Sequence, residues 1–297
     1  MAQSRKGNSL ARLLAKGFER ARRFVVTTRS RVSSSLPGSM FSTATFVGPR
    51  PARRRIAFIA AALAVVLSCW GVGRLRPRLA AAAMPLYRPC PSSREPCRIL
   101  PLGDSLTSGI GYEGGYRVAL FELARAAGKR ITFTGSLQNG PMLADGVAFP
   151  RRHEGRSGWK IAGVMATVPQ PALKTVPHIV LLHVGTNDVY AHESPAQMVE
   201  RAEQLIDRLK EAAPRALIVV AEIIPQTDPV LRDRSARYNA ELRRCVETRQ
   251  ARGEHVLIVD QFSHFPLTLL SDGVHPTQSG YEQMGRAWYA AIAAHLP

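Results

Sequence analysis

The chain has 297 residues, of which 45% are hydrophobic, and a formal net charge of +18 at pH 7. The apolar content allows a sizeable core, and the length is enough for one large domain with an appendage. The charge is uneven, because residues 1–98 hold 19 basic and two acidic residues, whereas residues 99–297 hold 21 basic and 20 acidic ones. This distribution argues against nucleic-acid binding by the main domain, although the net charge of the whole chain would suggest it.

Residues 1–55 form the most basic segment, with 13 Lys and Arg residues against one acidic residue. We interpret this segment as a disordered basic tail. Leu10, Leu13 and Phe18 have helical spacing, which leaves a transit-like or membrane-surface helix as the alternative. Translation from Met40 would replace the tail by a conventional short leader.

An uncharged run follows from Ile56 to Gly73, with arginines on both sides. At about 1.5 Å per residue, roughly 18 helical residues cover about 27 Å, just enough for the hydrocarbon core of a membrane. We therefore predict a transmembrane signal anchor or signal segment over residues 56–73, with a buried helix as the alternative. Since basic flanks stay in the cytoplasm, the large domain would be extracytoplasmic, either membrane-anchored or secreted. Cleavage near residues 80–83 and lipidation at Cys69 stay open.

Residues 74–97 are interpreted as a linker that contains two of the four cysteines. Cys90 and Cys97 close a short loop, and export would favour a disulfide between them, but the sequence leaves this pairing open. Cys245 lies in a helical stripe of apolar residues and is predicted to be an inert core residue. No cluster of cysteine and histidine has zinc spacing, so the sequence predicts no metal site.

Short β-rich runs alternate with helical periodicity over residues 98–297, which we predict to be one domain. Predicted strands cover residues 98–102, 131–134, 178–183, 216–223 and 255–259. Predicted helices cover residues 115–127, a segment capped by Ser194, residues 231–251 and a segment from about Thr277. This alternation predicts an α/β fold, a three-layer α/β/α sandwich around a five-stranded parallel sheet. Residues 135–158 are predicted to form a long loop of the kind that carries function.

Three short motifs hold the side chains that acyl transfer needs. They are GDSLT at 103–107, GTND at 185–188 and DGVHP at 272–276. The first follows the first predicted strand, the second follows the third strand, and the last lies beyond the fifth strand. Sites in parallel sheets form at the carboxyl ends of the strands, so we expect the three motifs to meet at one edge.

Each motif has a predicted chemical role. Serine is a weak nucleophile that needs a neighbouring base, and we assign these roles to Ser105 and His275. Asp272 can orient the imidazole and stabilise its charged form. Asn187 can donate a side-chain N–H to the oxyanion. This chemistry requires neither a metal nor an organic cofactor.

These motifs resemble those of the SGNH hydrolases, also called GDSL-type hydrolases. The four name-giving positions of that family match Ser105, Gly158, Asn187 and His275. The resemblance covers about residues 98–297 and implies a flavodoxin-like three-layer sandwich. It also implies an oxyanion hole that consists of the backbone N–H groups of Ser105 and Gly158 and the side chain of Asn187.

Longer matches look particularly like carbohydrate esterase family 3, whose members include acetylxylan esterases. They are HEGRSGW at 153–159, LLHVGTND at 181–188, the Tyr238-Asn239 pair and DGVHPTQSGYEQM at 272–284. The wider superfamily also contains lysophospholipases and thioesterases, so the resemblance limits the substrate only loosely.

Other residues near the motifs receive structural or substrate-binding roles. Asp104 and Asp188 are predicted to be structural. His153 and Glu154 are interpreted as substrate-binding residues at the rim of the site or as structural residues. Trp159 is predicted either to line the pocket or to pack against the following helix.

Positive charge near the predicted site comes from Arg151, Arg152 and Arg156. We interpret these arginines as a solvated face, with binding of acidic sugars as the alternative. His183 ends a buried strand and is predicted to be a core histidine with satisfied hydrogen bonds.

The sequence thus predicts a serine esterase that hydrolyses acetyl esters on carbohydrate through an acyl-enzyme. Its expected partners are an acylated carbohydrate and a membrane, contacted through residues 56–73. The alternatives are a lysophospholipase-like or thioesterase-like lipid hydrolase, an inactive carbohydrate-binding module on the same scaffold, and a basic adaptor that acts through its tail. The sequence does not indicate the oligomeric state.

Overall fold

The computed structural model describes residues 86–92 and 95–297. The predicted tail over residues 1–55, the predicted membrane segment over residues 56–73 and most of the linker lie outside the described residues. Within the part of the chain that is described, no helix combines the length and apolar character needed to cross a membrane.

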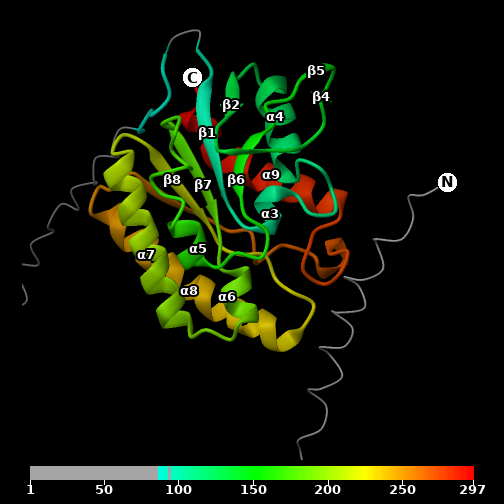
Figure 1. The fold of residues 1–297 in the computed structure, drawn as a ribbon, viewed down its shortest axis with the longest axis vertical. Helices are drawn as coiled ribbons and strands as arrows, with labels where there is room; N and C mark the ends of the chain where they lie inside the picture. The colour runs from blue at the N-terminus through cyan, green and yellow to red at the C-terminus, as the bar shows by residue number, and fades with distance from the viewer. Residues whose placement is uncertain (1–85, 93–94) are drawn as a thin grey trace, which may run out of the picture. The chain divides into compact units, whose positions relative to one another are not determined.

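Five parallel strands form the centre of the domain, as the sequence predicts (Figure 1). They are β1 (Cys97–Gly103), β2 (Ile131–Phe133), β7 (Ile179–His183), β8 (Leu217–Ala221) and β9 (Val256–Val259). Their spatial order is β2, β1, β7, β8, β9. Numbered along the chain, this is the 2-1-3-4-5 order of flavodoxin-like sheets, so the predicted fold class is confirmed.

Two further strands extend the sheet into the segment that was predicted to be a loop. β6 (Arg152–Gly155) pairs in parallel with the end of β1, where β2 no longer contacts it, and β3 (Leu137–Gln138) pairs antiparallel with β6. Pro101, which has no N–H to donate, lies in β1 between the residues that pair with β2 and those that pair with β6. The predicted loop over residues 135–158 is therefore wrong for these strands, and for the hairpin of β4 (Leu143–Ala144) and β5 (Val147–Ala148).

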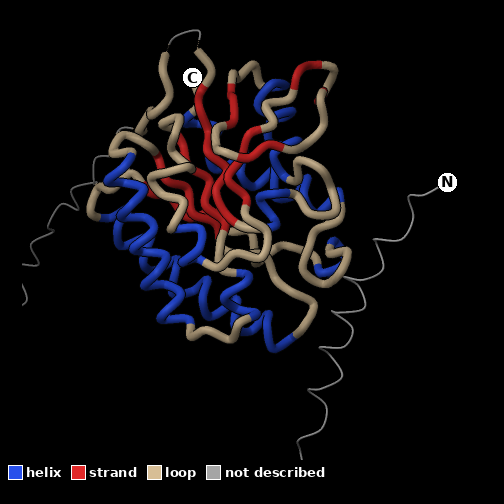
Figure 2. Tube along the Cα trace, in the orientation of Figure 1, coloured by secondary structure: helices blue, strands red, loops and turns tan. Residues whose placement is uncertain are grey.

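Helices cover both faces of the sheet (Figures 1 and 2). One face packs against α4 (Tyr116–Ala126) and α9 (Gln278–Ile292), and the other against α5 (Ile161–Met165), α7 (Pro195–Ala212) and α8 (Pro229–Ala251). Short helices α3 (Ser105–Ser108) and α6 (Thr186–Tyr190) follow β1 and β7, and two 3₁₀ turns, η2 (Leu267–Leu269) and η3 (Ala293–His295), flank α9. Because both faces are covered, alternate residues of β7 enter different cores and every residue of that strand is buried.

Helix starts agree with the capping residues in the sequence. The Ser194 hydroxyl accepts a hydrogen bond from the backbone N–H of Gln197 at 3.3 Å, and Pro195 is the first residue of α7. The Thr277 hydroxyl accepts from the backbone N–H of Gly280 at 3.3 Å at the start of α9. Each cap satisfies an N–H that has no acceptor within its helix.

The cysteines divide into one bonded pair and one free thiol within the described residues. Cys90 and Cys97 form a disulfide, which the sequence left open. His178 lies close enough to share a metal ion with these two sulfur atoms, but both sulfurs are bonded to each other. Cys245 is only half-buried and its thiol donates a hydrogen bond to Glu203 Oε1 at 3.0 Å, so its prediction as a core residue is wrong.

A glycine sets the direction of the chain as it leaves β7. Gly185 has a φ of +127°, and a Cβ at this position would lie 2.8 Å from the ring of the buried Tyr238. The Tyr238 hydroxyl donates to the backbone oxygen of Val184 at 3.2 Å. The ring therefore has little freedom to move away, and only glycine fits here.

We predict that Gly185→Ala lowers the free energy of unfolding by about 2–4 kcal/mol, because it adds backbone strain to overpacking against Tyr238. Gly128→Ala is the matched control, since Gly128 also has a positive φ, of +71°, but a Cβ added there would have no atom within 4 Å. The control variant should lose only about 1–2 kcal/mol. Urea denaturation of both variants measures the difference, and equal losses would contradict the role of the Tyr238 contact.

Candidate active site

Ser105 lies at the carboxyl edge of the sheet because β1 ends two residues before it. Gly103, the last residue of β1, lies so close to β7 that any side chain there would overlap the backbone oxygen of His183. Asp104 then caps α3 by accepting a hydrogen bond from the backbone N–H of Leu106 at 3.1 Å. Ser105 is thereby the first residue of α3, where its N–H has no acceptor within the helix. Its side chain is mostly buried, with 7% of the residue exposed.

The loop that carries the predicted base is fixed by its own hydrogen bonds. Asp272 Oδ1 accepts from the backbone N–H groups of Val274 at 3.0 Å and His275 at 2.7 Å. The backbone N–H and the hydroxyl of Ser271 donate to the carbonyl oxygen of His275 at 2.8 Å and 2.9 Å. Gly273 packs against the side chain of Thr227. The backbone N–H of Thr227 donates to the carbonyl oxygen of Gly273 at 3.0 Å. These bonds set the position of the imidazole before any substrate is present.

The structure brings Ser105, His275 and Asp272 into one hydrogen-bonded chain. Ser105 Oγ lies 3.0 Å from His275 Nε2, and Asp272 Oδ2 lies 2.8 Å from His275 Nδ1. Burial acts to raise the pKa of Asp272, but the hydrogen bonds from the backbone and ring of His275 outweigh it and the pKa lies below its usual value. An ionised carboxylate can only accept, so Nδ1 carries the proton and Nε2 is free to accept from the Ser105 hydroxyl.

Two further predicted residues, Asn187 and Gly158, lie in loops that a hydrogen bond joins. The Asn187 side-chain amide donates to the carbonyl oxygen of Trp159 at 2.9 Å, which joins the loop after β7 to the loop after β6. This bond uses one of the two amide hydrogens of Asn187 and leaves the other for a ligand. Gly158 is exposed and has a φ of +81°, a conformation that glycine adopts without strain.

Asp104 and Asp188 are both buried and bind backbone N–H groups, as structural residues do. Asp188 Oδ2 accepts from the backbone N–H of Ile161 at 3.0 Å, which connects α6 to the start of α5. Burial raises the pKa of Asp104 to about 7, although the hydrogen bond from Leu106 and the charge of His275 act to lower it.

The structure places His153 and Glu154 below the surface and leaves Trp159 partly exposed. His153 Nδ1 accepts from the backbone N–H of Gly155 at 3.0 Å, and burial lowers the pKa of His153 to about 3. Glu154 is fully buried. These positions favour the structural alternative for both residues. Trp159 packs against Gly163 of α5, which supports contact with the following helix.

Two expectations about charged and ionisable groups were wrong. Arg156 is not part of a solvated face, because its guanidinium binds the buried Glu154 carboxylate at 2.6 Å. Glu154 and Arg156 are two residues apart near the end of a strand, which places both side chains on one face. This spacing could have identified the ion pair from the sequence. His183 is buried as predicted, but neither ring nitrogen has a hydrogen-bond partner within the described structure, and burial lowers its pKa to about 4.

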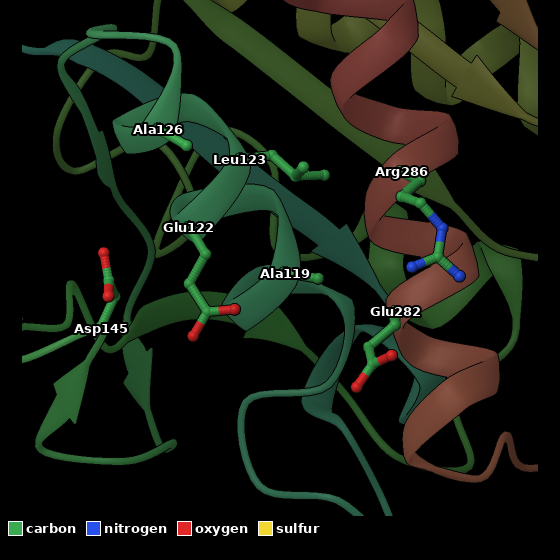
Figure 3. Close-up of a pocket in the computed structure, with 7 residues that line it drawn as sticks. All are labelled: Ala119, Glu122, Leu123, Ala126, Asp145, Glu282 and Arg286. Carbon is green, nitrogen blue, oxygen red and sulfur yellow. The ribbon is translucent and has the colours of Figure 1, made fainter.

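A cavity of about 530 Å³ lies elsewhere, between α4 and α9 (Figure 3). Its lining includes the carboxylates of Glu122, Asp145 and Glu282, with Arg286 on the α9 side. It contains none of the residues of the hydrogen-bonded chain. We therefore treat it as separate from the candidate active site.

The arrangement has parts that acyl transfer requires: a hydroxyl bonded to an imidazole, a carboxylate that orients the imidazole, and the backbone N–H of Ser105 at the start of α3. A profile of the GDSL-like Lipase/Acylhydrolase family matches residues 102–283, more than half of the chain. The chain belongs to this family. It is a carboxylic ester hydrolase, and the GDSL-type family expected from the motifs is confirmed.

Solved structures of carbohydrate esterases are similar to this GDSL-type esterase. The family 3 carbohydrate esterase of Clostridium thermocellum has 29% sequence identity and a TM-score of 0.60, over 67% of this chain and 96% of that one. The family 3 enzyme of Talaromyces cellulolyticus has 23% identity and a TM-score of 0.59, over 67% and 97% of the two chains, and supports the fold alone.

A curated relative, the "Multidomain esterase" of Ruminococcus flavefaciens, is 29% identical over 272 residues. The match covers 82% of this chain and 33% of the relative. This chain therefore spans about a third of the length of that protein.

We predict that stability depends on pH through Asp104. Because its pKa is raised from 3.8 to about 7, the native state keeps a proton that the unfolded chain has released at intermediate pH. The free energy of unfolding should therefore fall as the pH rises from about 4 to 7. Asp104→Asn keeps the cap but cannot titrate, so the stability of the wild type relative to this variant should decline over that range. Urea denaturation at pH 4.5 and at pH 7.5 measures the difference in free energy of unfolding between the wild type and Asp104→Asn. The same difference at both pH values would refute the prediction.

Proposed function

We propose that this GDSL-type esterase removes acetyl groups from hydroxyls of a carbohydrate by a Ser-His-Asp mechanism. The observation that carries the mechanism is the chain from Ser105 Oγ to His275 Nε2 at 3.0 Å and from His275 Nδ1 to Asp272 Oδ2 at 2.8 Å. The carbohydrate part rests on the similarity to the Clostridium thermocellum family 3 carbohydrate esterase.

In the first half-reaction, His275 Nε2 takes the Ser105 proton while Oγ attacks the carbonyl carbon of the acetyl group. The resulting oxyanion accepts hydrogen bonds from the backbone N–H groups of Ser105 and Gly158 and from the free amide hydrogen of Asn187. The C–O bond to the sugar breaks, and the imidazolium of His275 returns the proton to the leaving alkoxide. The products are a deacetylated sugar hydroxyl and an acetyl ester on Ser105.

In the second half-reaction, His275 deprotonates a water molecule that attacks the same carbonyl carbon. The tetrahedral intermediate uses the same three donors, and its collapse releases acetate and returns the proton to Ser105. Asp272 stays ionised and stabilises the imidazolium in both halves, which agrees with the lowered pKa of this carboxyl.

We predict that Ser105→Ala reduces kcat for p-nitrophenyl acetate by at least about 10³-fold, because the variant cannot form the acyl-enzyme. Ser108→Ala changes the same residue type in the same short helix and serves as the control, with an expected change of less than about threefold. Hydrolysis that persists in the Ser105 variant at the wild-type rate would refute the assignment of the nucleophile.

The size of the acyl group separates this proposal from lipid hydrolysis. We predict that kcat/KM for p-nitrophenyl acetate exceeds that for p-nitrophenyl decanoate by at least about tenfold, and that the enzyme releases acetate from acetylated xylan or another acetylated glycan. A preference for the decanoate would favour a lysophospholipase-like or thioesterase-like enzyme. Binding of the glycan without hydrolysis would favour an inactive carbohydrate-binding module.

A further inference from the structure

The guanidinium of Arg156 lies between a buried carboxylate and an aromatic ring. Its Nε and Nη2 atoms donate to Glu154 Oε1 at 2.9 Å and 2.6 Å, and its Cζ atom lies over the Trp159 ring, 5.3 Å from the centroid. The Glu154 side chain is fully buried, and only 23% of the Arg156 side chain is exposed. A guanidinium held by charge-assisted hydrogen bonds and by an aromatic face has little rotational freedom.

The carboxylate itself is anchored in the sheet. Glu154 is part of β6 and pairs with Leu102 of β1, three residues before Ser105. Its Oε2 atom accepts from the backbone N–H of Ser136 at 2.8 Å, while the Ser136 hydroxyl accepts from Arg156 Nη2 at 3.1 Å. Hydrogen bonds through Glu154 therefore fix the Arg156 guanidinium relative to β1, the strand that leads directly into Ser105.

The turn that presents Gly158 begins at Arg156 and ends at Trp159. The backbone N–H of Arg156 donates to the carbonyl oxygen of Gly103 at 2.8 Å, and the backbone N–H of Trp159 donates to the carbonyl oxygen of Arg156 at 3.0 Å. Gly158 lies between these two bonds. The contact of the guanidinium with the Trp159 ring thus joins the two ends of the turn through their side chains as well.

The same turn also contacts the second predicted donor. The Asn187 amide donates to the carbonyl oxygen of Trp159, so a displacement of Trp159 would move the acceptor that orients Asn187. We infer that Arg156 is a positioning residue that holds the Gly158 N–H, and through Trp159 the Asn187 amide, where they can donate to the oxyanion. This inference rests on the proposed function.

The physical reason is that oxyanion donors act only when they are already in place. They must lie about 2.7–3.1 Å from the oxygen as its charge develops. A misplacement of about 1 Å from a substitution outside the reacting groups can cost about 10²-fold in rate. Because the oxyanion exists only in the transition state and intermediate, such a loss should lower kcat and leave KM nearly unchanged.

The test uses Arg156→Met, which keeps the bulk of the side chain and removes the hydrogen bonds. We predict that kcat for p-nitrophenyl acetate falls by about 10- to 100-fold, with KM within about twofold of the wild type. Arg152→Met is the matched control, because Arg152 is an exposed arginine of β6 whose guanidinium donates to the backbone oxygen of Gly135. Its kcat should stay within about twofold of the wild-type value.

Removal of Arg156 alone leaves the Glu154 carboxylate buried without its partner, which could unfold the protein. The double variant Glu154→Gln/Arg156→Met removes this charge and should fold, as urea denaturation checks, yet keep the low kcat. Arg156→Lys retains the ion pair but not the planar guanidinium, and its kcat should lie between those of the wild type and Arg156→Met.

A thionoester substrate distinguishes positioning of the donors from a general structural effect. Sulfur accepts hydrogen bonds weakly, so an intact oxyanion hole favours the oxygen ester over the thionoester. The ratio of the two rates should fall in the Arg156 variants, as it should in Asn187→Ala. A lower kcat with an unchanged ratio, or a wild-type kcat in the folded double variant, would overturn the inference while the Ser105→Ala result upholds the proposed function. Wild-type hydrolysis that survives in Ser105→Ala would overturn both.

Discussion

The close alignment of β1 and β7 at the edge of the sheet is the constraint on which the candidate active site depends. Gly103 pairs with His183, and the lack of a side chain at Gly103 lets the two backbones approach. Both strands therefore end at the same level, and the loops that carry Ser105 and Asn187 begin side by side. The sheet order reverses at this point, because β2 and β6 lie on one side of β1 and the later strands on the other, which is where ligands bind in open α/β sheets.

Within this frame, aspartates that bind backbone N–H groups shape the loops. Asp104, Asp188 and Asp272 each accept at least one such bond, and each does so at the start of a turn or helix. Their different surroundings shift the pKa values of Asp104 and Asp272 in opposite directions. Burial raises the pKa of Asp104 to about 7, whereas the hydrogen bonds from His275 hold the pKa of the more exposed Asp272 below its usual value. Only the second can supply the permanent negative charge that an imidazolium needs nearby.

The amino-acid sequence alone determined the scaffold and the three motifs. Short apolar, β-rich runs predicted the five parallel strands, because a strand that is buried on both faces needs a continuous apolar run. The local capping pattern at Ser194 predicted where α7 begins, since the groups that bond are only three residues apart. The motifs around Ser105, Asn187 and His275 could be assigned to one edge because strand ends in a parallel sheet share that edge.

Only the tertiary structure decided the features that depend on partners far apart in the chain. β6 has charged residues and no strong strand propensity, and it forms because it pairs with the part of β1 beyond Pro101. Arg156 was predicted to be a solvated cation, but its guanidinium binds the buried Glu154 carboxylate. Cys245 was predicted to be a core residue, but its thiol is only half-buried, although Leu242 and Val246 of the same stripe are buried. The hydrogen bond between Ser105 and His275 joins residues 170 positions apart. Sequence patterns report short-range preferences, whereas burial and ion pairing depend on which distant segments pack together.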